Sequence, residues 1–294
     1  MGCPQGHPIH TMIAHDETIS ARDYKRVCEL VYREAGISLG SGKQTMLEAR
    51  IKRRLKVHNL TSYSEYCDYL FGHKGLKDEI PHLIDVVTTN KTDFFRESKH
   101  FDFLTAKALP DLQSRNRLGR PLLVWSAGCS TGEEPYTLAM VLSEFAEAHS
   151  GFRFRILATD ISTTVLAAAD RGVYSKDVIA PIPQSLQRKY FLRSRDPESN
   201  QVRIVPELRR TVEFRRLNFM DSDYGVGEKA DAIFCRNVII YFDRPTQERI
   251  LGNLANHLNP GGYMFVGHSE TLHDMNLPLT PVAPALYRRV DANA

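Results

Sequence analysis

The sequence has few of the features that mark membrane, secreted or nucleic-acid-binding proteins. No apolar run approaches the ~18 residues that a membrane-spanning helix requires. Residues 1–15 have neither the positively charged start nor the apolar centre of a signal peptide. A net charge of only +3 argues against bulk nucleic-acid binding. The five cysteines are odd in number and scattered, without metal-ligand spacing: Cys3, Cys28, Cys67, Cys129 and Cys235. We therefore expect a cytoplasmic protein with reduced thiols and no metal.

The length and composition favour a globular protein of more than one domain. A chain of 294 residues exceeds one average domain, so we expect one large domain and a smaller one. Hydrophobic residues make up 42% of the chain, which is enough for a substantial core. Residues 1–18 are expected to form a flexible tail.

The most informative stretch of the chain is 122–135. An apolar run over 122–125 predicts a buried strand, a small-residue loop with Gly128 and Gly132 follows, and Pro135 opens a helix. A strand, a glycine turn and a helix are typical of open parallel sheets that bind nucleotide-like ligands. Glu133 and Glu134 stand where a phosphate site would need bare amides, and would repel a pyrophosphate. The loop therefore favours a cationic ligand or a nucleoside without phosphates, and S-adenosylmethionine is both.

The N-terminal third is predicted to be helical. Helical spacing of apolar residues, with start and stop signals, predicts helices over 20–34, 43–57, from 62 onward, and 76–87, where Pro81 fits near the start or at a kink. Another helix is expected over 98–114, followed by a polar linker. These patterns predict a helical domain over 19–88, a linker with a connecting helix over 89–121, and an α/β domain over 122–294.

The remainder alternates between strands and helices, which predicts a parallel sheet. Strands are expected at 122–127, 154–158, 211–217, 232–235 and 263–266, with an antiparallel edge strand at 283–290. Helices are expected over 135–149, 163–171 and 246–258. Residues 173–210, which are rich in proline, interrupt this alternation. They favour a small inserted antiparallel β-subdomain; the alternative is a long connecting loop.

Three long motifs resemble those of the chemotaxis receptor glutamate methyltransferases, the CheR family. They are Thr-Asn-Lys-Thr-Asp-Phe-Phe-Arg at 89–96, Ser-Thr-Gly-Glu-Glu-Pro-Tyr at 130–136, and Phe-Cys-Arg-Asn-Val-Ile-Ile-Tyr-Phe-Asp at 234–243. Gly-His-Ser-Glu at 267–270 fits the same pattern, and the resemblance covers about 19–289. It implies methyl transfer from S-adenosylmethionine to glutamate side chains of bacterial chemoreceptors. The implied fold is a helical N-terminal domain and a Rossmann-like class I methyltransferase sheet with an inserted β-subdomain.

The resemblance also implies a set of cofactor contacts. They are Asn90, Thr92, Arg96, Glu133, Asp160, Asn218, Phe219, Arg236 and Asn237. Asp160 also ends the second predicted strand, where such folds place an acid on the ribose hydroxyls. Three of these positions have a plainer alternative. Asp160 could cap the next helix, Glu133 could simply complement a helix dipole, and Asn218 could form a turn.

The chemistry of the reaction suggests two catalytic residues. A glutamate carboxylate is already ionised near pH 7, so no strong general base is needed. Catalysis should come from holding the reactants together and excluding water. Arg96 is the natural clamp for the acceptor carboxylate. Tyr241 is the second candidate, as a hydroxyl donor that orients the oxygen; alternatively it is a packed aromatic residue.

A basic helix suggests how a receptor docks. Arg50, Arg53 and Arg54 share one face of the predicted helix over 43–57, which favours docking of an acidic helical receptor; the alternative is an ordinary solvated face. In some family members the inserted subdomain binds a C-terminal receptor peptide by adding a strand. Those members carry glycines in its turn, whereas the turn at 194–200 has none. We expect a monomer that binds the cytoplasmic helical part of chemoreceptors and no nucleic acid.

Two other functions remain open at this point. A dehydrogenase that uses NAD is disfavoured because the loop over 128–132 does not match G-x-G-x-x-G. A methyltransferase-like binding module without turnover is disfavoured by the presence of both Arg96 and Tyr241. Catalytic turnover on a receptor fragment would separate this module from an enzyme.

Overall fold

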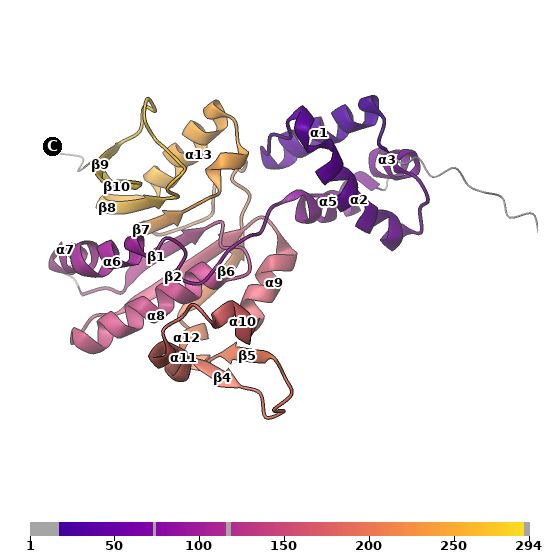
Figure 1. The fold of residues 1–294 in the computed structure, drawn as a ribbon. Coiled ribbons are helices and arrows are strands. Elements are labelled where there is room, and N and C mark those ends of the chain that lie inside the picture. Colours follow the sequence, from indigo (N-terminus) through magenta and orange to yellow (C-terminus); the bar gives the residue numbers. More distant parts are fainter. Residues whose placement is uncertain (1–17, 73–74, 116–118, 291–294) are drawn as a thin grey trace, which may run out of the picture. The chain divides into compact units, whose positions relative to one another are not determined.

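The computed structural model describes residues 18–72, 75–115 and 119–290. Contacts between Cα atoms divide the chain into two compact units (Figure 1). The first runs to Tyr32 and continues over Leu39–Val87, and the second contains Arg33–Ser38 and Thr88 onward. Except for Thr18, the tail expected over 1–18 lies outside the described residues. No helix among the described residues is both long and apolar enough to span a bilayer.

The first unit is built of helices. In chain order these are α1 (Ala21–Ala35), the 3₁₀ turn η1 (Ser41–Lys43), α2 (Gln44–His58), α3 (Tyr63–Phe71), α4 (Gly75–Asp78) and α5 (Ile80–Val87). Serine hydroxyls cap α1 and α3, where Ser20 Oγ accepts from Asp23 N and Ser62 Oγ accepts from Glu65 N, each at 3.1 Å. The helix expected over 76–87 is instead two short helices, because Pro81 lacks the N–H that a continuous helix needs.

The second unit is organised around a seven-stranded sheet with the order β6-β2-β1-β7-β8-β10-β9. The parallel strands are β1 (Leu122–Ala127), β2 (Phe154–Asp160), β6 (Val212–Arg216), β7 (Ala230–Cys235) and β8 (Leu258–Val266). In β1 and β7 every residue is buried. This is expected of central parallel strands, because helices or loops cover both faces of such a sheet.

The C-terminal end of the sheet differs from the expected single edge strand. Residues 279–289 form a hairpin in which β9 (Leu279–Ala283) pairs with β10 (Leu286–Arg289), and β10 pairs antiparallel with β8. The outermost strand is therefore β9, and it contains Pro281. The prediction of one strand over 283–290 was wrong because Pro281 and Pro284 hid the strand pattern, and proline is tolerated in an edge strand.

Helices of the second unit precede or connect these strands. They are α6 (Lys99–Phe103), the π-helical turn η2 (Leu104–Ala108), α7 (Leu109–Arg115), α8 (Glu133–Ala148), α9 (Thr163–Arg171), the 3₁₀ turn η3 (Ile239–Tyr241) and α13 (Arg244–Asn256). α8 begins at Glu133 rather than at Pro135, so both glutamates belong to its first turn. α6 to α7 form the connecting helix expected over 98–114, with one π-helical turn inside it.

Residues 173–210 form the expected small antiparallel sheet, which has three strands. Its order is β3-β5-β4, with β3 (Val173–Ser175), β4 (Phe191–Arg193) and β5 (Gln201–Ile204). Three short helices accompany it: α10 (Lys176–Ile179), α11 (Gln184–Tyr190) and α12 (Pro206–Arg209). Residues 194–200 connect β4 to β5, where the turn was predicted. The fold is thus the predicted α/β sheet with an all-helical N-terminal part and an inserted antiparallel sheet.

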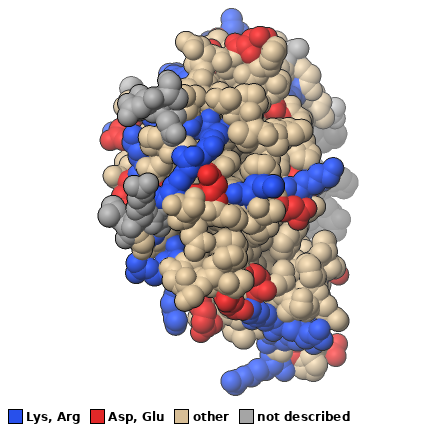
Figure 2. Space-filling view, turned by 90° about the vertical axis from the view of Figure 1, so that its left-hand side faces the viewer, with Lys and Arg blue, Asp and Glu red and all other residues tan. Residues whose placement is uncertain are grey.

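Charges on the surface are mixed in sign on the face drawn in Figure 2. Lysine and arginine side chains are interspersed there with acidic and uncharged residues. The described residues of this face thus show no broad area of one sign, in keeping with a net charge of +3 for the whole chain.

Candidate active site

The candidate site is built from loops that follow the parallel strands. β1, β2, β6, β7 and β8 run in the same direction, so their carboxyl ends share one edge of the sheet (Figure 1). Ligands of open α/β sheets bind at this edge, beside the point where the strand order reverses. Here that point is β1. The chain adds β2 and β6 on one side of β1, and then β7 and β8 on its other side.

The loop after β1 ties three segments of the chain together. Ser130 N donates to Asp160 Oδ2 at the end of β2, and Ser130 Oγ donates to the carbonyl of Asn90, both at 2.9 Å. Gly132 has φ +98°, and a Cβ there would lie 2.8 Å from Tyr174 Oη and 2.9 Å from Ala169 Cβ. Only glycine fits this position without strain. The predicted contacts Asn90 and Asp160 therefore lie on neighbouring segments.

Two carboxylates give this loop a negative character. Glu133 is buried in the first turn of α8, and its Oε2 accepts from Thr131 Oγ1 at 2.6 Å. Burial raises the pKa of Glu133, and the Thr131 hydroxyl partly opposes that rise. Asp160 accepts from Ser130 N and from Ser162 N. These two hydrogen bonds hold the Asp160 carboxylate at the end of β2, beside the loop that follows β1.

Arg236 lies at the end of β7 and is enclosed by protein partners. Its Nε donates to Glu134 Oε2 at 2.7 Å, and its NH1 donates to the carbonyl of Arg96 at 2.7 Å. NH1 also lies 3.1 Å from His100 Nδ1, and the side chain is 2% exposed. Arg236 thus joins α8 to the 88–98 segment. Because these contacts engage its guanidinium and the side chain is almost fully buried, the geometry favours a role in holding the site together.

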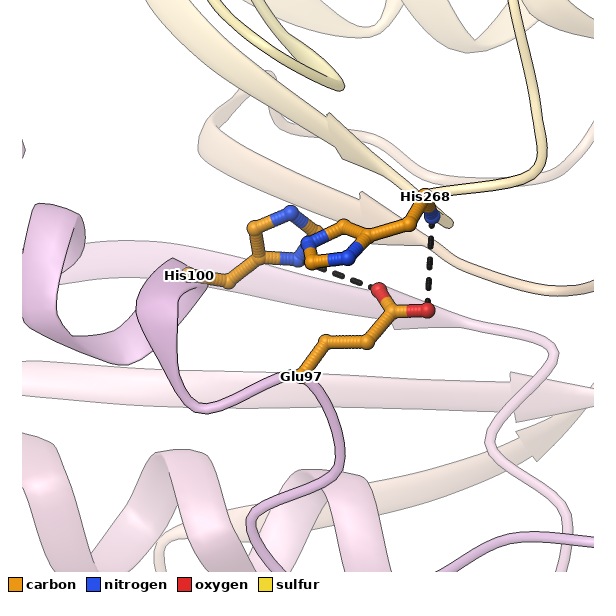
Figure 3. A group of neighbouring side chains, drawn as sticks. All are labelled: Glu97, His100 and His268. Atoms are coloured by element: carbon orange, nitrogen blue, oxygen red, sulfur yellow. Dashed lines mark hydrogen bonds and ion pairs between the residues drawn. The ribbon is translucent and has the colours of Figure 1, made fainter.

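Glu97, His100 and His268 form a close group beside Arg236 (Figure 3). Their potential ligand atoms lie within 4.8 Å of one another. Two imidazoles and a carboxylate are a donor set typical of zinc. However, the Arg236 guanidinium lies 3.6 Å from Glu97 Oε2 and donates to His100 Nδ1, so a cation would compete with it at both atoms. Burial and the charge of Arg236 lower the pKa of His100 to about 4, which keeps its imidazole neutral.

Glu270 holds the loop that follows β7. Its buried carboxylate accepts from Asn237 N and Ile239 N, each at 2.9 Å, and from Gly267 N at 2.5 Å. From the other side, Gln247 Nε2 of α13 donates to the carbonyl of Ile239 at 2.9 Å. Two side chains, Glu270 and Gln247, thus satisfy the N–H of Asn237 and both backbone polar groups of Ile239.

Several loop residues at this edge adopt a left-handed backbone. Phe95, Glu97, Ser130 and Asn237 have φ between +48° and +57°. Such conformations cost energy in residues other than glycine and cluster at functional sites. In addition, Asn237 Oδ1 is buried and has no hydrogen-bond partner among the described residues. A buried acceptor without a partner is what a ligand donor would satisfy.

The remaining predicted contacts lie on the same unit. Arg96 is half-buried, and its NH1 donates to the carbonyl of Lys91 at 3.0 Å. Asn218 follows β6; its Nδ2 donates to the carbonyl of Glu34 at 2.6 Å, and its Oδ1 accepts from Met220 N at 3.0 Å, as in a turn. The ring of Phe219 lies 6.4 Å from that of Phe242, next to Tyr241. Thr92 and Tyr241 are half-buried.

The three arginines predicted to dock a receptor differ in their surroundings. Arg54 Nε and NH2 bind the buried carboxylate of Glu79 at 2.8 and 2.7 Å, and Arg50 NH1 donates to the carbonyl of Val87. Both guanidinium groups thus have partners inside the helical unit. Arg53 is exposed, as are Lys52 and Lys56 on the same helix. Of the three arginines, Arg53 is thus the exposed one, and docking of a receptor on this helix stays a prediction.

Sequence reasoning missed the residues that organise the site. Glu134 was noted only as a neighbour of Glu133, and Glu97, His100 and Glu270 received no role. Their partners lie far along the chain, such as Glu134 with Arg236 and Glu270 with Asn237. The available signal was that each lies within or beside a motif that carries predicted contacts.

Comparisons with known proteins agree with this geometry. Residues 22–88 match the family model of the CheR methyltransferase all-alpha domain, and residues 90–284 match that of the CheR methyltransferase SAM binding domain. The chain belongs to the CheR family.

Relatives match over nearly their whole length. A chemotaxis protein methyltransferase of Borreliella burgdorferi is 40% identical over 274 residues, covering 92% of this chain and 95% of that protein. Chemotaxis protein methyltransferase 2 of Pseudomonas aeruginosa is 42% identical over 250 residues, covering 84% and 86%. The Escherichia coli relative, also a chemotaxis protein methyltransferase, is 39% identical over 272 residues, covering 92% and 91%. The chain is therefore an S-adenosylmethionine-dependent methyltransferase of chemotaxis.

Proposed function

We propose that this protein transfers the methyl group of S-adenosylmethionine to glutamate side chains in the cytoplasmic helical part of chemoreceptors. The observation that carries this proposal is the acidic character of the loop edge around Gly132. Glu133 and Asp160 surround a glycine turn, an arrangement that suits a cationic nucleoside and opposes a pyrophosphate. Membership of a family of chemotaxis methyltransferases supports a receptor as the acceptor.

Each end of the cofactor has a suitable partner at this edge. The carboxylate of Glu133 would balance the positive amino and sulfonium groups, and the carboxylate of Asp160, at the end of β2, would accept from the ribose hydroxyls. The unpartnered Asn237 Oδ1 would accept from a cofactor N–H group. Asn90 and Thr92 line the same edge on the 88–98 segment, while Asn218 and Phe219, after β6, would contact the adenine. Arg236 would affect cofactor binding indirectly, because it donates to the carbonyl of Arg96 and so holds that segment in place.

The residues of the chain would contribute orientation rather than proton transfer. S-adenosylmethionine supplies an electrophilic methyl group on a positively charged sulfur. An oxygen of the ionised acceptor carboxylate forms the new C–O bond as the C–S bond breaks, so no proton moves. Arg96 would clamp the carboxylate through its guanidinium N–H groups, and Tyr241 would donate its hydroxyl to the same carboxylate. Both act by positioning the attacking oxygen in line with the sulfur.

Receptor recognition would use residues of α2 and of the small inserted sheet. The exposed Lys52, Arg53 and Lys56 of α2 suit an acidic helical partner. A receptor tail peptide could also add to β4, an edge strand of the small sheet on which Leu192 is 50% exposed. The turn without glycine at 194–200 argues against such tethering, and titration with a tail peptide decides it. We propose that the protein acts as a monomer.

The decisive experiment follows a labelled methyl group. Purified protein is incubated with methyl-labelled S-adenosylmethionine and cytoplasmic receptor fragments, and the label is then tested for release as methanol by base. Glutamyl methyl esters release methanol under these conditions, whereas methylated amines do not. Arg96→Ala should abolish transfer in a folded protein, because the carboxylate loses its clamp. Near-normal turnover in that variant would remove the role of Arg96.

A binding measurement separates the cofactor from the acceptor. Calorimetric titration should show micromolar affinity for S-adenosylmethionine and S-adenosylhomocysteine and no binding of NAD. Labelled transfer to glutamine- or alanine-substituted receptor sites should be lost. Binding of the cofactor without any transfer to receptor fragments would instead favour a sensing module.

A further inference from the structure

The loop between β7 and η3 encloses an anion site that the chain itself fills. Backbone N–H groups of Asn237, Ile239 and Gly267 converge on one point, and the carboxylate of Glu270 occupies it, at 2.5 to 2.9 Å from their nitrogens. Burial raises the pKa of Glu270, and the backbone N–H groups that surround its carboxylate partly oppose that rise. Converging backbone amides of this kind make a nest that binds anions.

The loop is dependent on this carboxylate for its shape. Asn237 has φ +57°, which is costly without external restraint, and its N–H donates to Glu270 Oε2. Glu270 is 5% exposed, so loss of the carboxylate would leave buried N–H groups unsatisfied. The same loop carries Tyr241 two residues beyond Ile239, and both are part of the turn η3.

The turn at 267–270 is shaped to bring the carboxylate to this point. Glu270 N donates to the carbonyl of Gly267 at 2.9 Å, which closes the turn. A Cβ at Gly267 would lie 2.5 Å from Asn237 Nδ2 and 2.9 Å from Glu270 Oε2. Glycine is therefore needed for the close approach of the two loops.

We propose that Glu270 is a positioning residue for methyl transfer: its carboxylate fills the amide nest of the 237–239 loop and so orients Asn237 toward the cofactor and Tyr241 toward the acceptor. The roles of Asn237 and Tyr241 rest on the proposed function. The nest itself rests on geometry within a single unit of the chain. Glu270 acts through backbone N–H groups and does not contact the reacting atoms.

Chemical rescue tests this role directly. Glu270→Ala removes the carboxylate but leaves the nest, so a small carboxylate added to the buffer can refill it. We expect S-adenosylmethionine affinity and kcat each to fall by about tenfold or more, because buried donors lose their acceptor. Acetate at about 0.1 M should restore a threefold or larger part of the loss, whereas chloride at the same ionic strength should not.

Matched variants separate positioning from a loss of folding. Glu228→Ala, which removes an exposed partner of Arg155 outside the candidate site, should behave as wild type with and without acetate. Glu270→Gln keeps the side-chain volume but presents an amide N–H₂ to backbone donors. It should lose activity as Glu270→Ala does, yet acetate should not rescue it, because the amide occupies the nest. Gly267→Ala should also lose activity, with the KM for the receptor unchanged.

The outcomes are clear in either direction. Rescue of Glu270→Ala by acetate, absent in Glu270→Gln, supports the proposal. Affinity and turnover within twofold of wild type in Glu270→Ala, or a loss that acetate does not restore in the folded variant, overturns it. If Glu270→Ala does not fold, near-normal cofactor affinity in Glu270→Gln overturns it, and a tenfold loss supports it. Because cofactor affinity needs no receptor, this result stands apart from the test of the acceptor.

Discussion

Each unit of this protein contains an arginine paired with a buried glutamate, yet the two pairs serve different purposes. Arg54 and Glu79 join helices of the first unit at 2.7 Å, and Arg236 and Glu134 join a loop to α8 of the second unit at the same distance. Around Glu79 the further partners are Tyr66 and His58, which lie on regular helices. Around Arg236 they are the carbonyl of Arg96 and His100, on the segment that carries the candidate site.

The difference lies in what each pair restrains. Regular helices hold their backbone with their own hydrogen bonds, so the Arg54–Glu79 pair contributes to packing of an already ordered unit. The 88–98 segment and the loop after β7 have left-handed residues and no such internal ladder. There the ionic partners determine where the chain runs. The same pair of side chains thus affects stability in one unit and the geometry of the site in the other.

The largest expected effect is on the stability of the helical unit. Glu79→Ala removes the acceptor of Arg54 and of the Tyr66 hydroxyl, and should lower the free energy of unfolding of that unit by about 3–5 kcal/mol. Denaturant unfolding measures the loss, and S-adenosylmethionine affinity should stay within twofold. Glu29→Ala, from the exposed pair with Lys25, is the control and should cost less than about 0.5 kcal/mol. A comparable loss of stability in Glu79→Ala and Glu29→Ala would contradict the structural role assigned to Glu79.

Titration of His100 should make the stability of the sheet unit depend on pH. The pKa of His100 is lowered to about 4 by burial and by Arg236, whereas an unfolded histidine titrates near 6.5. The unfolded state therefore binds the proton first, so the stabilisation is complete above pH 6.5 and is lost as the pH falls to about 4. The loss amounts to about 3 kcal/mol over this window.

The control for this pH effect is His100→Asn, whose carbonyl can still accept from Arg236 but cannot titrate. Between pH 7 and pH 4, the free energy of unfolding should fall more steeply in the wild type than in His100→Asn. Parallel pH profiles of the two proteins would mean that His100 is charged at neutral pH or does not titrate in this range.

The pair in the sheet unit should instead control ligand affinity. Arg236→Lys retains the charge, but one ammonium group cannot reach Glu134, the Arg96 carbonyl and His100 together. We expect S-adenosylmethionine to bind about 10- to 100-fold more weakly. Calorimetry measures this. Arg54→Lys, the same change in the helical unit, should leave the affinity within twofold, and equal losses in both variants would remove the distinction drawn here.

The smallest effect concerns receptor recognition. Arg53→Glu reverses an exposed charge on α2, and should raise the KM for the receptor by about threefold at low salt with kcat unchanged. Kinetics at two ionic strengths measure it, since the difference from wild type should shrink as salt screens the charge. Arg193→Glu is the control, because it reverses an exposed charge on β4, a strand that is not expected to contact the body of the receptor. An unchanged KM for Arg53→Glu would exclude α2 as a docking surface.

The sequence predicted most of the helices and strands and suggested where the site lies, but it did not predict which side chains of the site contact one another. Strand and helix patterns predicted the parallel strands because buried apolar runs are local signals, and the loop at 128–132 pointed to the ligand. The pairing of Glu134 with Arg236 or of Glu270 with Asn237 depends on which loops meet in three dimensions. No spacing in the chain encodes that meeting.

On the predicted docking helix α2, residues that look alike in the sequence have different surroundings in the structure. Arg50, Arg53 and Arg54 look equivalent on a helical wheel, because each lies on one side of α2. Only the position of the buried Glu79 on a later segment distinguishes Arg54 from Arg53. Likewise, the prolines at 281 and 284 concealed a hairpin, because their cost depends on whether a strand lies at an edge or in the middle of a sheet.

That hairpin also has a consequence for how the protein behaves at high concentration. An outermost strand with free N–H and C=O groups is a template on which a second copy can pair and start aggregation. In β9 the middle residue is Pro281, which has no N–H to offer and interrupts any continuous ladder. A hydrophobic residue such as Val282, 43% exposed beside it, is thereby tolerated on the surface. The same proline that makes this strand hard to recognise in the sequence thus keeps the edge of the sheet from pairing with a second copy.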